Sequence, residues 1–210
     1  MTLEISPISY GVGAEIRNLD LAKPLDAETA AEVKKAWNEY HVLLFRDQDI
    51  TPEQHLAFTK ALGPTEPYPL FHYRHPDVPE IFLLSNMKSG GKRSETADAG
   101  RAWHADLSYT TKPAVGSILR CIKTPDYGGN TMFANQHMAY DRLSPTYQQL
   151  IDGLEAVHQL FAKTKNLDKL DQKEVADLKK AHPPVIQPMV RTHPESGRKA
   201  LYVSPANTTQ

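Results

Sequence analysis

The sequence has a single cysteine, Cys121, among its 210 residues. One thiol excludes an internal disulfide framework and is typical of a protein that works in the reducing cytosol. Cys121 lies in an apolar, strand-like run. We therefore expect it to be buried by packing rather than exposed and reactive.

Long apolar runs and long charged blocks are also missing. No stretch approaches the ~20 apolar residues of a membrane-spanning helix, and the N-terminus lacks the basic and apolar segments of a signal peptide. The formal net charge is −1, without a long basic block. Nucleic acid and membrane are therefore not expected partners, and a cytoplasmic location is expected.

The residues that are present suit one globular domain of mixed α and β structure. Hydrophobic residues make up 40% and charged residues 23% of the chain, enough for a sizeable core. Asp26 is placed to cap a helix over 27–40, and Thr51, Pro52 and Gln54 form the pattern of a capping box. Further patterns predict a hairpin over 3–16, strands at 42–45, 80–85, 113–122, 131–135 and 155–161, a helix over 144–154, and a hairpin turning at 195–197.

Two segments remain open to more than one interpretation. Residues 162–181 are rich in Lys and Asp, which predicts a solvated helix or an insertion; the alternative is a lid. His158 lies in an apolar, strand-like stretch and is expected to be a core histidine.

The most informative motif is the triplet His104-Ala105-Asp106. In a strand, residues two apart project to the same face, so the imidazole and the carboxylate would point the same way. These two ligand types begin the facial triad that binds non-haem Fe(II) with open coordination positions. The alternative is a solvated loop histidine beside a surface acid. A long polar loop over 89–100 precedes the triplet, and such loops in compact domains are often functional.

Several motifs follow one another in a specific order. They are W-H-x-D-x-S-Y at 103–109, P-A-x-G-S-I-L at 113–119, P-x-x-G-G-N-T-x-F-A-N at 125–135 and A-Y-D-x-L-S at 139–144. Together they resemble the taurine dioxygenase family of Fe(II)- and 2-oxoglutarate-dependent dioxygenases. The likeness also takes in 11–16, 44–54 and 190–203, so it covers essentially the whole chain. It implies a double-stranded β-helix (jelly roll) core with flanking helices, and a single catalytic domain over 1–210.

The resemblance assigns roles to individual residues. His104 and Asp106 become the expected metal ligands and catalytic residues, and Thr131 the expected contact of 2-oxoglutarate. Expected substrate contacts are His72, Leu107 and Tyr109. The implied cofactor is Fe(II), with 2-oxoglutarate and O2 as cosubstrates. The implied reaction is hydroxylation of a small, anionic organic substrate, such as a sulfonate or an aryloxy or other carboxylate, with release of succinate and CO2. Self-association into a homo-oligomer stays open.

The sequence also departs from the family pattern. Family members are usually longer, and their further portion carries a distal histidine ligand and an arginine that holds 2-oxoglutarate. We find neither before residue 210 and expect the C-terminal part of the catalytic domain to be missing. Residues 67–73 and Gly100 match poorly where taurine-using members bind the sulfonate, so taurine is not the expected substrate.

Two other functions stay open. The first is a non-enzymatic, small-molecule-binding jelly roll that lacks a complete metal triad. The second is a Zn(II)-dependent hydrolase or isomerase that uses His104, Asp106 and His193. The resemblance places His193 in a surface hairpin and not at the distal ligand, which disfavours the second alternative.

Overall fold

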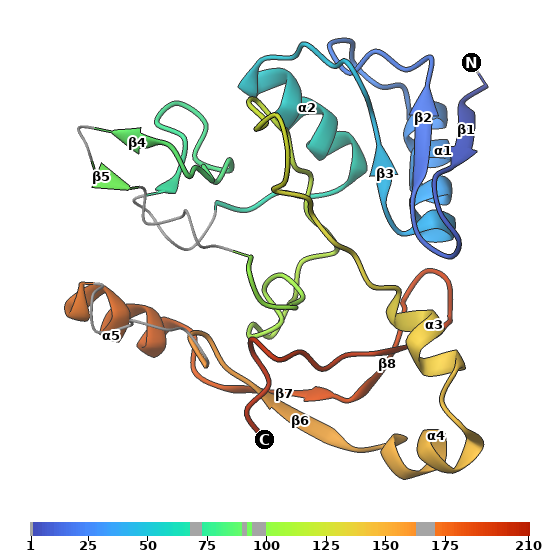
Figure 1. Cartoon of the computed structure of the whole chain (residues 1–210), viewed down its shortest axis with the longest axis vertical. Coiled ribbons are helices and arrows are strands. Elements are labelled where there is room, and N and C mark those ends of the chain that lie inside the picture. Colours follow the sequence, from blue (N-terminus) through green and yellow to red (C-terminus); the bar gives the residue numbers. More distant parts are fainter. Residues whose placement is uncertain (1, 68–72, 90–91, 94–99, 163–170) are drawn as a thin grey trace. The chain divides into compact units, whose positions relative to one another are not determined.

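The structure is a computed structural model that describes residues 2–67, 73–89, 92–93, 100–162 and 171–210. The chain forms two compact units (Figure 1). Unit 1 comprises Met1–Ala97 and Ile118–Asn135, and unit 2 comprises Asp98–Ser117 and Gln136–Gln210.

A small mixed sheet organises unit 1. Strands β1 (Glu4–Pro7) and β2 (Ala14–Arg17) form the predicted antiparallel hairpin, with Ile5 opposite Ile16. Strand β3 (Leu43–Leu44) pairs in parallel with β2. The expected strand at 42–45 is thus confirmed in shortened form, and its residues are half-buried.

Both predicted helices of unit 1 begin at the expected caps. Helix α1 (Ala27–Tyr40) begins after Asp26, whose carboxylate accepts the backbone N–H of Thr29 at 2.7 Å. Helix α2 (Pro52–Leu62) begins with the complete capping box of Thr51 and Gln54, and it ends at Gly63. These side chains satisfy N–H groups that the first helical turn leaves without intrahelical partners.

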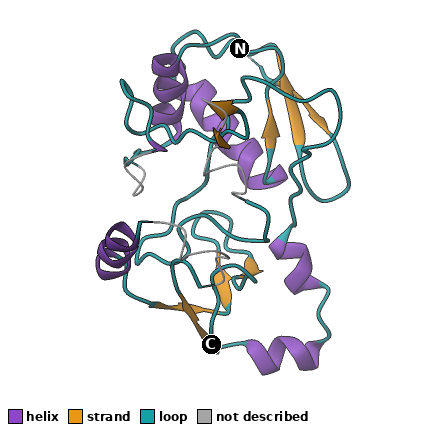
Figure 2. Ribbon diagram, turned by 60° about the vertical axis from the view of Figure 1, so that its left-hand side comes forward, coloured by secondary structure: helices purple, strands orange, loops and turns teal. Residues whose placement is uncertain are grey.

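The core of unit 1 joins the sheet to the two helices. Val33 of α1 is fully buried, and Phe58 of α2 meets the ring of Phe45 edge-on at 5.4 Å between centroids. Figure 2 shows these helices beside the strands of the same unit. The buried cluster consists of Leu3, Ile16, Leu21, Val33, Ala36, Ile50 and Phe58.

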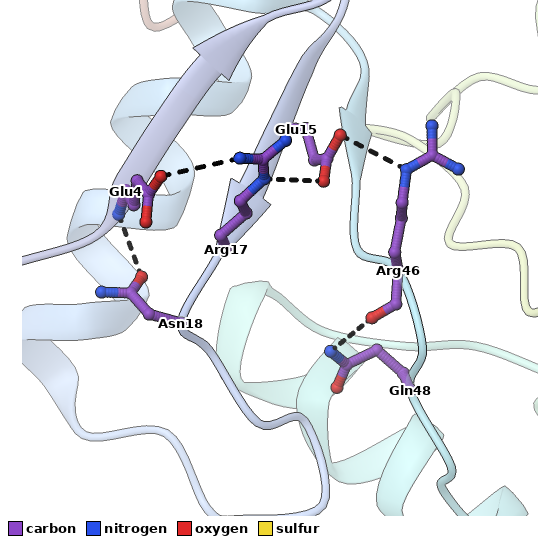
Figure 3. A network of polar contacts seen from close by, with 6 residues as sticks. All are labelled: Glu4, Glu15, Arg17, Asn18, Arg46 and Gln48. Atoms are coloured by element: carbon purple, nitrogen blue, oxygen red, sulfur yellow. Dashed lines mark hydrogen bonds and ion pairs between the residues drawn. The ribbon is translucent and has the colours of Figure 1, made fainter.

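A polar network ties the hairpin to the segment that follows β3 (Figure 3). The Glu15 carboxylate bonds Arg17 at 3.0 Å and Arg46 at 3.3 Å, and Arg17 above all holds the pKa of Glu15 below its usual value. The Gln48 side chain donates to the carbonyls of Leu19 and Arg46 and accepts the N–H of Leu21. Exposed ion pairs contribute little stability, so the glutamine that serves three backbone groups is the stronger constraint on these loops.

Three expected strands are wrong. Residues 80–85 contribute one isolated bridge, Arg74 to Phe82, and the segments at 113–122 and 131–135 are not strands. Several of their apolar side chains stay in solvent, with Val115 83% and Ile122 80% exposed, whereas Ile118 packs against the core of unit 1. A strand needs a neighbour to satisfy its N–H and C=O groups. Within the described residues, no strand pairs with 113–122 or 131–135. For the same reason the expected burial of Cys121 is wrong, since its side chain is exposed.

The remaining strands of unit 1 form a short antiparallel pair, β4 (Lys88–Ser89) and β5 (Lys92–Arg93).

The described residues of unit 2 form three helices and two antiparallel strand pairs. Helices α3 (Gln136–Asp141) and α4 (Pro145–Ile151) come first, and Ser144 caps α4. Strand β6 (Glu155–His158) pairs with β7 (Val185–Pro188), and β8 (Val190–Thr192) pairs with β9 (Lys199–Leu201). The predicted helix at 144–154, strand at 155–161 and C-terminal hairpin are confirmed with shorter bounds.

Helix α5 (Gln172–Ala181) occupies the Lys- and Asp-rich segment. It presents one buried residue, Val175, so the solvated-helix interpretation is confirmed for 172–181. Residues 163–170 lie outside the described part of the chain.

No helix in the described residues is both long and apolar enough to span a membrane.

His158 is the buried histidine that the sequence predicted. It is 1% exposed, and its ring stacks on Tyr202 at 5.5 Å between centroids. Its Nε2 lies 3.4 Å from the hydroxyl of Thr208. Burial is the main cause that lowers the pKa of His158, because the charged imidazolium loses its water.

This burial predicts a pH-dependent stability. The unfolded chain takes up a proton at His158 near pH ~6.5, whereas the folded chain resists protonation until a lower pH. The contribution of neutral His158 is therefore complete above about pH 6.5 and is lost as the pH falls toward the folded pKa.

His158→Phe keeps an aromatic ring against Tyr202. We expect its unfolding free energy to fall less than that of the parent when the pH is lowered from 7.5 to 5.5. Urea unfolding of both proteins at several pH values measures the difference, and the other histidines cancel in the comparison. Equal pH slopes would contradict the assignment.

Candidate metal site

The segment with the H-x-D triplet lies in unit 2 and is a series of turns rather than a strand. The N–H of Ser108 bonds the carbonyl of Ala105 at 3.3 Å, and that of Thr110 bonds Leu107 at 3.0 Å. Leu107 has a left-handed backbone with φ 53°. The expected strand alternation is therefore wrong, but the turns still bring His104 and Asp106 together.

The two side chains face each other through one atom each. His104 Nε2 lies 3.2 Å from Asp106 Oδ1. The other ring nitrogen, Nδ1, lies 2.8 Å from the carbonyl of Ala102. The other carboxylate oxygen, Oδ2, accepts a short hydrogen bond from the hydroxyl of Ser117. The hydrogen bonds at Nδ1 and Oδ2 thus orient the two groups, so that Nε2 of His104 and Oδ1 of Asp106 point toward each other.

This arrangement fits a divalent metal ion. Metal-binding histidines usually donate their second ring N–H to a carbonyl or carboxylate, and metal-binding carboxylates are themselves hydrogen-bonded. Two neighbouring octahedral ligands about 2.1 Å from a metal stand about 3.0 Å apart. The observed 3.2 Å between Nε2 and Oδ1 is close to that separation. The pair could therefore supply two ligands to one ion.

Electrostatics couple the pair strongly. The hydrogen bond to Asp106 is the main cause that raises the pKa of His104 to about 9. The same bond, helped by Ser117, lowers the pKa of Asp106. Without metal, a proton therefore joins the two groups. A divalent ion requires the neutral imidazole and the carboxylate, so it would take the place of that proton.

The other predicted site residues fall in different places. Tyr109 is 8% exposed and meets the ring of His182 edge-on at 5.8 Å, and Leu107 is half-buried. Thr131 belongs to unit 1, where its exposed side chain follows two glycines with left-handed backbones. His72 lies outside the described residues. The structure therefore brings His104, Asp106, Leu107 and Tyr109 into one segment of unit 2.

His193 has a role in its own hairpin. Its Nδ1 accepts the backbone N–H groups of Glu195 and Ser196 at 3.3 and 3.2 Å, and its ring meets that of His137 edge-on. In the part of the chain that the structure describes, no group of three or more His, Cys, Asp or Glu side chains could hold a metal ion. The described residues thus offer a pair of candidate ligands, and His193 does not join them.

Two residues near the pair escaped the sequence analysis. Ser117 follows Asp106 by eleven positions, and no local pattern links a serine at that distance to a carboxylate. Gln187 is buried and donates to the carbonyls of Ser108 and Thr110. A signal did exist for Gln187, because a lone amide in the apolar stretch 185–190 requires a buried hydrogen-bond partner.

Comparisons with known proteins identify the family of the chain. A 2,4-dichlorophenoxyacetate dioxygenase dependent on alpha-ketoglutarate, from Cupriavidus pinatubonensis, is 30% identical over 97% of this chain and 74% of its own length. An alpha-ketoglutarate-dependent sulfate ester dioxygenase from Pseudomonas putida is 31% identical over 96% of this chain and 66% of its own. The crystal structure of a taurine dioxygenase from Burkholderia xenovorans matches with a TM-score of 0.77 and 31% identity, over 100% of this chain and 65% of that one.

These relatives define the class as the 2-oxoglutarate-dependent dioxygenases, which are oxidoreductases that use Fe(II), 2-oxoglutarate and O2. The family model described as "Taurine catabolism dioxygenase TauD, TfdA family" matches residues 4–210. The chain belongs to this family, as its motifs predicted. It spans between 65% and 74% of the length of the three relatives described above.

Proposed function

We propose that His104 and Asp106 are two of the protein ligands of the Fe(II) that this enzyme class uses. The observation that carries the proposal is the convergence of Nε2 and Oδ1, each held by a hydrogen bond to the atom behind it. The side chains are 38% and 51% exposed. An ion pair so open to water contributes little stability, so stability alone gives no reason to orient it this way.

When bound, Fe(II) supplies the activation of O2 that couples decarboxylation of 2-oxoglutarate with hydroxylation of the substrate. The chain's own residues do the rest. His104 and Asp106 hold the ion with coordination positions left open. Thr131 donates its hydroxyl to a carboxylate of 2-oxoglutarate. Leu107, Tyr109 and His72 contact the substrate.

The two units together form one catalytic domain with a jelly-roll core in this proposal. Support comes from the match to a taurine dioxygenase structure over the whole chain. It also comes from five apolar residues in strand-like stretches of the sequence that are exposed, as residues prepared for a larger sheet would be: Val115, Leu119, Ile122, Met132 and Phe133.

The substrate is a small organic anion other than taurine. Relatives whose names specify a chlorinated phenoxyacetate and a sulfate ester support this class, because both compounds are anionic. The poor match at 67–73 and at Gly100 disfavours taurine itself.

The non-enzymatic alternative gains no support, since the named relatives are enzymes. The Zn(II) alternative loses its third ligand, because Nδ1 of His193 serves the backbone of its hairpin.

We expect His104→Ala and Asp106→Ala each to abolish Fe(II)-dependent succinate formation while far-UV circular dichroism stays unchanged, because a triad without one ligand holds iron poorly. Asp177→Ala, which removes an exposed carboxylate on α5, is the matched control and keeps full activity. Full turnover by either ligand variant under limiting iron would refute the assignment.

We expect Thr131→Val to raise the KM for 2-oxoglutarate about tenfold or more, with little effect on the KM for the prime substrate. The reason is the loss of one hydrogen bond to a charged group, worth about 1.5–3 kcal/mol. Thr131→Ser keeps the hydroxyl and serves as the control. Steady-state succinate release measures both constants, and an unchanged KM for 2-oxoglutarate would make Thr131 a structural residue.

We expect taurine to be a poor substrate. Sites built around hydrogen bonds discriminate strongly when donors and acceptors do not match. The measurement is succinate release by the full-length protein with a panel of sulfonates, alkyl sulfates, aryloxyalkanoates and other carboxylates. The highest kcat/KM with taurine would overturn the proposed substrate class and leave the reaction class standing.

A further inference from the structure

Gln187 connects strand β7 to the segment that carries the proposed metal ligands. Its side chain is 8% exposed. The amide nitrogen Nε2 donates to two backbone carbonyls, those of Ser108 at 3.3 Å and Thr110 at 3.0 Å. These residues precede Gln187 by 79 and 77 positions, so the contact is purely tertiary.

The two ends of this contact differ in how they are held. Gln187 stands opposite Ala156 in the β6–β7 pair, and Ala156 is itself buried. Residues 104–110 form turns, and the hydrogen bonds within them are local, from Ser108 to Ala105 and from Thr110 to Leu107. The backbone of Leu107 is left-handed, a conformation that costs free energy for a residue with a side chain. The strand therefore offers a fixed support to a segment that is strained.

The chemistry of the contact requires an amide. The Nε2 group of glutamine has two N–H donors, which matches two carbonyls. Methionine has a similar length and no donor, and glutamate offers mainly acceptors that would face the carbonyl oxygens. Removing the amide would leave two carbonyls of the turn without this partner, and Ser108 is fully buried.

We propose that Gln187 is a positioning residue for the metal site, acting through the backbone of Ser108 and Thr110 to hold Asp106 in its ligand geometry. This inference rests on the proposed function of His104 and Asp106. Substitution of a residue that orients a metal ligand from behind typically weakens metal affinity by about 10–100-fold. Because Gln187 acts through the backbone, we expect an effect at the lower end of that range.

The test is Mn(II) affinity, measured by electron paramagnetic resonance titration of the full-length protein at a temperature where each variant is folded. Gln187→Met removes both donors and keeps the length of the side chain. Ile186→Met introduces the same residue at the neighbouring position, which is 65% exposed, and is the matched control. We expect Gln187→Met to weaken Mn(II) binding about tenfold and Ile186→Met to leave it unchanged.

The outcomes distinguish a failure of the role of Gln187 from a failure of the proposed metal site. If Gln187→Met lowers Tm but binds Mn(II) as tightly as the parent, Gln187 is a structural residue and the inference fails while the metal site stands. If His104→Ala binds Mn(II) as well as the parent does, the metal site is wrong and the inference falls with it.

A measurement on the unaltered protein covers the case in which Gln187→Met does not fold. Metal binding and the Gln187 contact are coupled, so each must strengthen the other. We expect Mn(II) to slow amide hydrogen exchange both in 105–110 and in β7. Protection of 105–110 without any change in β7 would overturn the inference.

Discussion

The arrangement around Asp106 depends on hydrogen bonds that approach the two proposed ligand side chains from behind. Ala102 fixes the ring of His104, and Ser117 fixes the carboxylate of Asp106, so one free atom of each side chain faces the other at 3.2 Å. Neither side chain is buried enough for packing to orient it. The hydrogen bonds from Ala102 and Ser117 therefore orient the pair, and the proposed role depends on that geometry because an open metal site needs prearranged ligands.

The turn that carries these ligands connects the site to the fold of unit 2. A strand would have placed His104 and Asp106 on one face by its alternation, but the chain here bends through a left-handed residue, Leu107. Turns lack the ladder of a sheet, so a support must come from elsewhere. The buried amide of Gln187, presented by a paired strand, supplies hydrogen bonds to two carbonyls of the turn.

Local patterns predicted the elements whose stabilising contacts are themselves local. Asp26 and Thr51 cap their helices as expected, and the hairpins at both ends of the chain form with shorter strands. The strands expected at 113–122 and 131–135 do not form, because a strand depends on a neighbour that can come from anywhere in the sequence. The burial of Cys121 failed with them.

The sequence alone determined the family, since several spaced motifs are specific in combination, and the resemblance to that family pointed to the two proposed ligands, His104 and Asp106. The tertiary structure decided what holds those ligands. Ser117 lies 11 residues from Asp106, and Gln187 lies 79 residues from Ser108. Hydrogen bonds between such positions depend on how the chain returns to itself, so no periodicity or local spacing reports them.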